Sequence, residues 1–114
     1  MVGHLNNLDG VTIQSDLVQG VHMKVLVGPQ DGWSDHVMRV FDVEVGGHTP
    51  HHQHPWPHIN YIIAGTGDLM IDGVHHTITA GSYGYVPQDT IHQFKNVGDE
   101  PLRFICIVPK EGHK

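Results

Sequence analysis

The stretch "GGHTPHHQHPWPHINYIIAGTG", residues 46 to 67, decides how the rest of the chain is interpreted, because it holds five histidines within eleven residues. Neutral imidazole is the commonest metal ligand in proteins. In a strand, side chains two residues apart project from the same face, so His52 and His54 point together while His51 points the other way. The stretch therefore predicts a chelating pair of histidines.

Two more histidines can join this pair. Pro55 and Pro57 flank Trp56 and restrict a short turn, which returns the chain so that His58 faces the same interior. His92 follows a second turn, at residues 87 to 89. Four imidazoles around an octahedral ion leave two positions open for water, dioxygen or substrate. We expect one divalent transition metal per chain, held by His52, His54, His58 and His92.

The rest of the chain has the pattern of an all-β protein. Short apolar runs rich in Val, Ile and Tyr alternate with Gly, Pro or Asp, and no segment shows helical periodicity. Asp72-Gly73 lies between two alternating runs and predicts a type I′ hairpin turn. The runs predict about ten strands, at residues 11–14, 21–28, 36–45, 49–54, 59–65, 67–71, 74–80, 82–87, 91–96 and 102–109. Such spacing is typical of a sandwich or a closed barrel.

Composition excludes several classes of partner. The formal net charge is −6, and the six Lys and Arg residues are scattered singly, which argues against nucleic acid and anionic lipid. Cys106 is the single cysteine and cannot form an intrachain disulfide, and the first residues lack the features of a signal peptide. No apolar run approaches the roughly 20 residues of a spanning helix. We expect a cytoplasmic protein with no membrane partner.

The first ten residues show little pattern. Residues 1–10 could hang free, as many termini do, or form an arm that adds a strand to a neighbouring subunit. Both alternatives stay open at the level of the sequence.

Two spacings resemble the conserved motifs of the cupin superfamily. In the first motif, residues 46–65, Gly46 is followed after five residues by His52, after one by His54, after three by His58 and after six by Gly65. In the second motif, residues 81–96, the corresponding residues are Gly81, Pro87, His92 and Asn96, separated by five, four and three residues.

This resemblance implies an all-β fold of the cupin type, a double-stranded β-helix or jelly-roll antiparallel barrel, in one domain spanning residues 1–114. The chain looks like the small single-domain cupins that bind a metal through four histidines, some of which are manganese proteins. The resemblance favours Mn or Fe, although Zn, Ni or Cu can occupy four neutral nitrogen ligands in purified protein. It also implies a homodimer.

The chain departs from the cupin pattern at two positions. The usual Glu of the first motif is His58, so the predicted site has no anionic protein ligand. A metal held this way keeps its full positive charge and favours anionic or enolate oxygen. The Gly that normally follows the second-motif Pro by two residues is Asp89, which we expect in a tight turn with an unusual φ.

Strand alternation predicts the walls of a pocket. From His58 the same face carries Asn60 and Ile62, and from His92 it carries Phe94. The pocket is then mainly apolar with one amide, which suits a small organic ligand.

Three further pocket residues carry open alternatives. In "RFICIVP", residues 103–109, Phe104 and Cys106 share one face, and either face of this run could point inward. Cys106 is then either a soft residue near the metal or a buried small hydrophobe. Trp56 either covers the pocket or caps the end of the barrel.

The resemblance favours a Mn- or Fe-dependent oxidoreductase, dioxygenase-like, acting on a small organic molecule. A cupin that holds a metal and a small ligand without turnover is the alternative from another class, and a Lewis-acid isomerase is a third possibility. We assign no catalytic residue, because alternation places no acid or base next to the predicted metal. His48 and His51 are not expected to be ligands.

Overall fold

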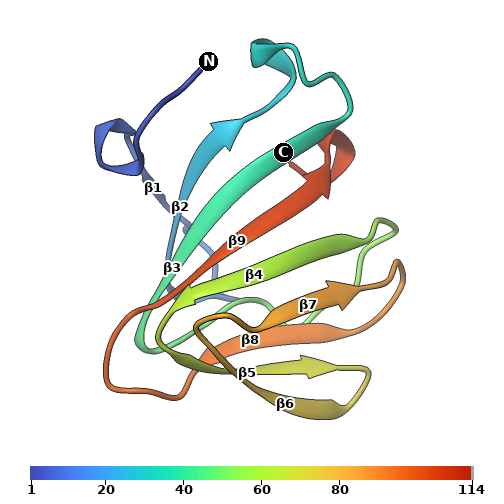
Figure 1. The fold of residues 1–114 in the computed structure, drawn as a ribbon. Coiled ribbons are helices and arrows are strands. Elements are labelled where there is room, and N and C mark those ends of the chain that lie inside the picture. The colour runs from blue at the N-terminus through green and yellow to red at the C-terminus, as the bar shows by residue number, and fades with distance from the viewer. Residues whose placement is uncertain (114) are drawn as a thin grey trace.

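The computed structural model describes residues 1 to 113 and is built almost entirely from strands (Figure 1). The described residues contain three short 3-10 turns, η1 (Leu5–Asn7), η2 (Pro29–Asp31) and η3 (Lys110–Gly112), and no α-helix. The strands are β1 (Val11–Thr12), β2 (Gln19–Val27), β3 (His36–His48), β4 (His58–Ala64), β5 (Thr66–Ile71), β6 (Val74–Thr79), β7 (Tyr83–Val86), β8 (His92–Asn96) and β9 (Leu102–Pro109).

The strands form one antiparallel sheet that curls into a nearly closed barrel. Its order is β6-β5-β8-β3-β9-β4-β7, with β2 added beside β3 and β1 beside β2. In Figure 1, β2, β3, β9 and β4 run side by side, and β7, β8, β5 and β6 lie below them. The predicted all-β antiparallel barrel is confirmed.

The core fills the inside of the barrel through strict alternation. β9 alternates buried and half-buried residues along its whole length. Phe94 of β8 and Phe104 of β9 stack with their ring centroids 4.2 Å apart, and Ile62 of β4, which is 1% exposed, belongs to the same core cluster. These residues bury the apolar surface that stabilises the fold.

Two predicted turns are confirmed by their backbone angles. Asp72 and Gly73 have φ values of 51° and 81°, as the two central residues of a type I′ turn require. Asp89 has a φ of 56°, in the left-handed region that Asp tolerates better than most residues. Its N–H donates to the carbonyl of His54 at 2.8 Å, so this turn is tied to the histidine-rich loop.

The predicted strand at residues 49–54 is wrong. The segment is a loop, and within it His52 alone makes a bridge, exchanging backbone hydrogen bonds of 3.2 and 2.9 Å with His92. Pro50 and Pro55 explain the difference, because neither has the N–H that a longer ladder would need. The preceding strand β3 instead runs three residues further than predicted, to His48.

The N-terminal residues fold back on their own chain. β1 pairs with β2, and the ammonium group of Lys24 donates to the carbonyl of Leu5 at 3.1 Å. Leu5 is thus held by Lys24, whereas Val2 is 101% exposed. A free end and exchange with a neighbouring subunit both stay predictions for residues 1–10. Within residues 1 to 113, no helix is both long enough and apolar enough to cross a membrane.

Candidate metal centre

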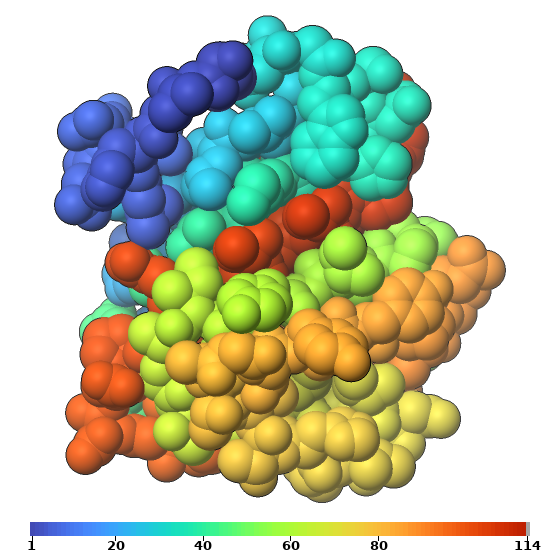
Figure 2. Space-filling view, in the orientation of Figure 1, coloured from blue at the N-terminus to red at the C-terminus, as the bar shows by residue number. Residues whose placement is uncertain are grey.

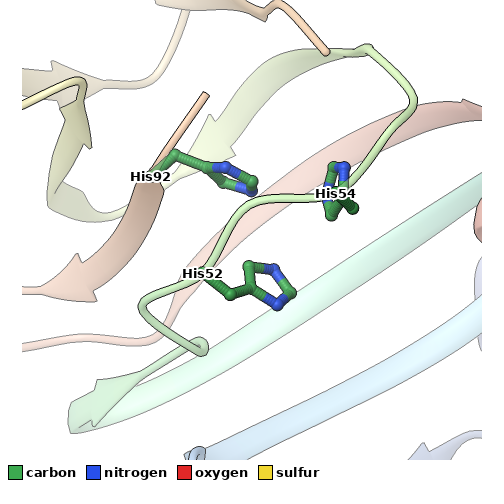
Figure 3. A group of neighbouring side chains, drawn as sticks. All are labelled: His52, His54 and His92. Atoms are coloured by element: carbon green, nitrogen blue, oxygen red, sulfur yellow. The ribbon is translucent and has the colours of Figure 1, made fainter. Parts of the chain in front are cut away.

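Three histidines from two separate parts of the chain converge inside the barrel. His52 and His54 project from the loop before β4, and His92 projects from the first position of β8; Figure 3 shows their rings directed toward a common space. One nitrogen atom of each ring lies within 4.8 Å of the others. The backbone bridge between His52 and His92 fixes this arrangement, because it joins the two segments directly.

His58, the first residue of β4, lies against this group. Its Nε2 is 3.2 Å from Nε2 of His92, and its ring centroid is 5.4 Å from that of His54. His58 is 7% exposed and His92 is 4% exposed, whereas His52 lies at the open side. The structure thus brings the four predicted ligands together, three as a close group and His58 beside them.

Hydrogen bonds fix which ring nitrogen of His54 and His92 carries the proton. Nδ1 of His54 lies 2.9 Å from the carbonyl of Trp56, and Nδ1 of His92 lies 2.9 Å from the carbonyl of Thr90. A carbonyl oxygen only accepts, so each Nδ1 must be the donor. In the neutral ring the other nitrogen, Nε2, then carries a free lone pair.

The same reasoning applies to His58. The amide nitrogen of Asn60 donates to the carbonyl of Ile105 at 3.3 Å, which orients the amide so that Oδ1 faces His58. Nδ1 of His58 donates to this oxygen at 2.7 Å. His58 Nε2 therefore also carries a lone pair.

The arrangement of the rings offers a place for a cation. With both Nδ1 atoms protonated, Nε2 of His58 and Nε2 of His92 face each other at 3.2 Å as two acceptors, so no hydrogen bond between neutral rings can form there. Two nitrogens each about 2.1 Å from one metal are about 3.0 Å apart when they bind at a right angle. The histidines therefore fit one divalent transition metal.

The rings are held in the neutral form that a metal needs. Burial, followed by the neighbouring His92, lowers the pKa of His58 to about 3. Burial together with His92 and His54 lowers the pKa of His52 to about 4, and burial lowers the pKa of His92. A metal would thus meet little competition from protons near neutral pH.

The other histidines of the opening stretch lie outside this group. His51 is exposed, and Nδ1 of His48 lies 3.1 Å from the carbonyl of Thr49.

A cavity of about 250 Å³ opens next to the histidines. Five of the six predicted pocket residues line it: Trp56, Asn60, Phe94, Phe104 and Cys106.

Ile62 is the exception and corrects the pocket prediction. It faces inward as alternation requires, but it lies two residues beyond Asn60, opposite Phe104 in the sheet, and packs in the core instead of lining the cavity.

The structure shows where the side chains of Trp56 and Cys106 lie. The Trp56 ring stacks on His54 at 4.8 Å, so it forms a wall beside the histidines. Cys106 is on the inward face of β9, where burial raises the pKa of its thiol. Its Sγ accepts a hydrogen bond from Arg39 at 3.3 Å. Cys106 is therefore a neutral thiol in the cavity wall.

The sequence reasoning missed several lining residues. Arg39 and Phe41 reach the cavity from β3, Met23 reaches it from β2, and His113 closes in from the C-terminal side. Alternation could not identify the inward face of β3, because both of its faces carry apolar residues. His113 follows the last strand and had no pattern at all.

Comparison with known proteins supports the fold and the family. Residues 39–108 match the family model described as a cupin domain. The chain belongs to this family. It is 31% identical to the 1-methylthio-D-xylulose 5-phosphate methylsulfurylase of Rhodospirillum rubrum over 77 residues. These residues make up 68% of this chain and 49% of that protein. The chain spans 49% to 64% of the length of the curated relatives that it matches.

Two solved structures share the cupin barrel of this chain. The polyketide cyclase RemF from Streptomyces resistomycificus has a TM-score of 0.88 at 22% identity, over 96% of this chain and 78% of that one. A protein from Thermotoga maritima described as a predicted oxalate decarboxylase has a TM-score of 0.87 at 22% identity, over 96% of this chain and 98% of that one. At these identities the likeness extends to the fold alone.

Proposed function

We propose that this cupin is a metal-dependent oxidoreductase, dioxygenase-like, which acts on a small organic molecule. One Mn or Fe ion per chain is held by His52, His54, His58 and His92. The observation that carries the proposal is the pair of unprotonated Nε2 atoms, on His58 and His92, that face each other at 3.2 Å and need a cation between them.

The protein's own residues have distinct roles at this centre. Asn60 and the Trp56 and Thr90 carbonyls hold three of the rings in the tautomer that presents Nε2. The stacked rings of Phe94 and Phe104 form an apolar wall that limits water around a bound molecule. When bound, the metal supplies Lewis acidity and, for Mn or Fe, electron transfer.

A reaction that uses Lewis acidity without electron transfer is the second candidate. No Asp or Glu lines the cavity within the described part of the chain, so neither proton transfer nor charge stabilisation there can rely on a carboxylate. The shared barrel of the polyketide cyclase RemF is compatible with this candidate. A binding module without turnover would use the same residues.

The first experiment measures the metal. Protein purified without a nickel column is analysed by mass spectrometry as wild type, His58→Ala, His92→Ala and His51→Ala. We expect close to one Mn or Fe per chain in wild type, a loss of most of it in the first two variants, and full retention in His51→Ala, the matched control. Metal retained after both substitutions would contradict the four-histidine centre.

The second experiment separates the reactions. Oxygen uptake is recorded with a panel of small organic acids and phenols for the Mn- and Fe-loaded protein, with His92→Ala as the control. Uptake that depends on both metal and His92 supports the oxidoreductase. Conversion of a substrate under nitrogen would instead select the Lewis-acid reaction, and saturable binding with no conversion would select the binding module.

A further inference from the structure

Arg39 places a positive charge on the cavity wall. It lies on β3 directly opposite Cys106 of β9, which in turn lies opposite Asn60 of β4. All three residues line the cavity. Adjacent strands are about 4.8 Å apart, so Arg39 begins roughly 10 Å from the strand that carries His58 and Asn60.

The guanidinium of Arg39 is only partly satisfied by the protein. Nη2 donates to Sγ of Cys106 at 3.3 Å, a weak acceptor, and the guanidinium carbon lies 5.0 Å from the centre of the Phe41 ring. Nε is buried and has no hydrogen-bond partner; across residues 1 to 113 it is the one buried side-chain polar atom in this condition. A buried, unsatisfied donor on a charged group costs stability, unless a ligand supplies the acceptor.

Arg103, the other arginine of the chain, lies on the same pair of strands and has the carboxylate partner that Arg39 lacks. Arg103 of β9 lies opposite Asp42 of β3, and its Nε and Nη2 donate to the two carboxylate oxygens at 2.7 and 3.1 Å. This is the two-point pairing that the planar guanidinium favours. Arg39 lines the cavity without such a partner, because the described lining contains no carboxylate.

We infer that Arg39 binds the carboxylate of the organic molecule that enters this cavity. The occupant is then a small organic acid with an apolar body, which packs against Phe41, Phe94 and Phe104 while its far end reaches the histidines. The inference rests on the proposed function for the far end, but the pairing of Arg39 with a carboxylate does not require the metal.

The test compares an acid with its neutral analogue. Binding of benzoate and of benzamide is measured by calorimetry for wild type, Arg39→Gln, Arg39→Lys and Arg103→Gln, each in Mn-loaded and in metal-free form. We expect Arg39→Gln to weaken benzoate 10- to 100-fold and benzamide less than twofold, in both metal states. The benzoate affinity of Arg39→Lys should lie between those of wild type and Arg39→Gln, because lysine keeps the positive charge but lacks the planar guanidinium. Arg103→Gln should match wild type.

Three results would contradict the role of Arg39, and each has a different meaning. Equal weakening of benzoate and benzamide would mean that Arg39 only shapes the cavity. Benzoate binding that is lost on metal removal and unaffected by Arg39→Gln would mean that the metal binds the carboxylate. No saturable benzoate binding by wild type at millimolar concentration would also overturn the inference. The metal content of the same samples reports on the four-histidine centre independently.

Discussion

The two faces of strand β4 differ in polarity, and the buried face is the more polar one. The inward face carries two polar side chains and one apolar one, all nearly inaccessible: His58, Asn60 and Ile62, at 7%, 4% and 1% exposure. The outward face is apolar and open: Ile59, Tyr61 and Ile63, at 48%, 50% and 41% exposure.

This difference shows that hydrophobicity does not identify the inside of this barrel. Apolar residues are common on protein surfaces, whereas buried polar groups need a specific reason. His58 and Asn60 have one, because they hydrogen-bond to each other and direct Nε2 toward His92. The inward face is therefore organised around the histidine group, whereas the outward face is apolar and exposed.

The largest expected effect is on the acid stability of the metal-free protein. An unfolded histidine binds its proton near pH 6.5, but folded His58 does so only near pH 3, so the unfolded state binds more protons between these values. The free energy of unfolding should fall as the pH drops from 6.5, and His58 alone contributes about 2 kcal/mol of this loss by pH 4.5. Urea unfolding at several pH values measures it.

Two variants show whether the inward face is responsible. His58→Gln should flatten the pH dependence, whereas His76→Gln, which removes an exposed histidine from β6, should leave it unchanged. A free energy of unfolding that is equal at pH 7 and pH 4.5 in wild type would show that the inner histidines are not held neutral.

The next effect concerns the partner of His58. Asn60→Ala removes the oxygen that holds the His58 ring, and the dissociation constant for Mn should rise 10- to 100-fold. Asn60→Asp keeps an acceptor and should restore most of the affinity. Tyr61→Phe, a change on the opposite face of the same strand, is the control and should have no effect. Equal affinities for Asn60→Ala and wild type would remove Asn60 from the centre.

Substitutions on the outward face of β4 should have the smallest effect on the fold. Ile59 lies between Ile107 and Tyr85 on the neighbouring strands, and Tyr61 lies between Ile105 and Tyr83. Figure 2 views this side, where β9, β4 and β7 form adjacent red, green and orange bands. These two rows carry no charge, and we expect a protein contact there, because exposed apolar patches are typical of such contacts.

A second copy of this chain is the partner we expect there, because an uncharged face can pair with itself about a two-fold axis. Tyr61→Lys would bring two like charges together at such an axis. Sedimentation should show a dimer for wild type and a monomer for this variant, with unchanged metal content and stability within about 0.5 kcal/mol. A variant that remains dimeric would place the interface elsewhere.

Much of the candidate centre could be predicted from the sequence, because it depends on local spacing. His52 and His54 are two residues apart, and the turn between Pro55 and Pro57 returns the chain within four residues to His58. His92 was a candidate because it follows the turn at residues 87 to 89, and the resemblance to the second cupin motif supported it. The hairpin at Asp72-Gly73 followed from the backbone angles that these two residues tolerate.

The remaining features depend on information that alternation does not contain. Arg39 lies on a strand with apolar residues on both faces, so the inward side is settled only by its pairing with β9. The depth of the cavity decides that Asn60 lines it and Ile62 does not. The reference pKa of histidine would also place proton competition near pH 6.5, whereas burial moves it to about 3 for His58.

The packing of η3 has a practical consequence for anyone who handles this protein. A side chain at Gly112 would begin 2.5 Å from Nε1 of Trp56 and 2.5 Å from Cγ2 of Val108, so the backbone there is pressed against the wall of the cavity. His113 already lines that cavity. Histidines engineered directly after His113 would therefore begin at the cavity that His52, His54, His58 and His92 also line, where they would compete with these residues for an added metal ion.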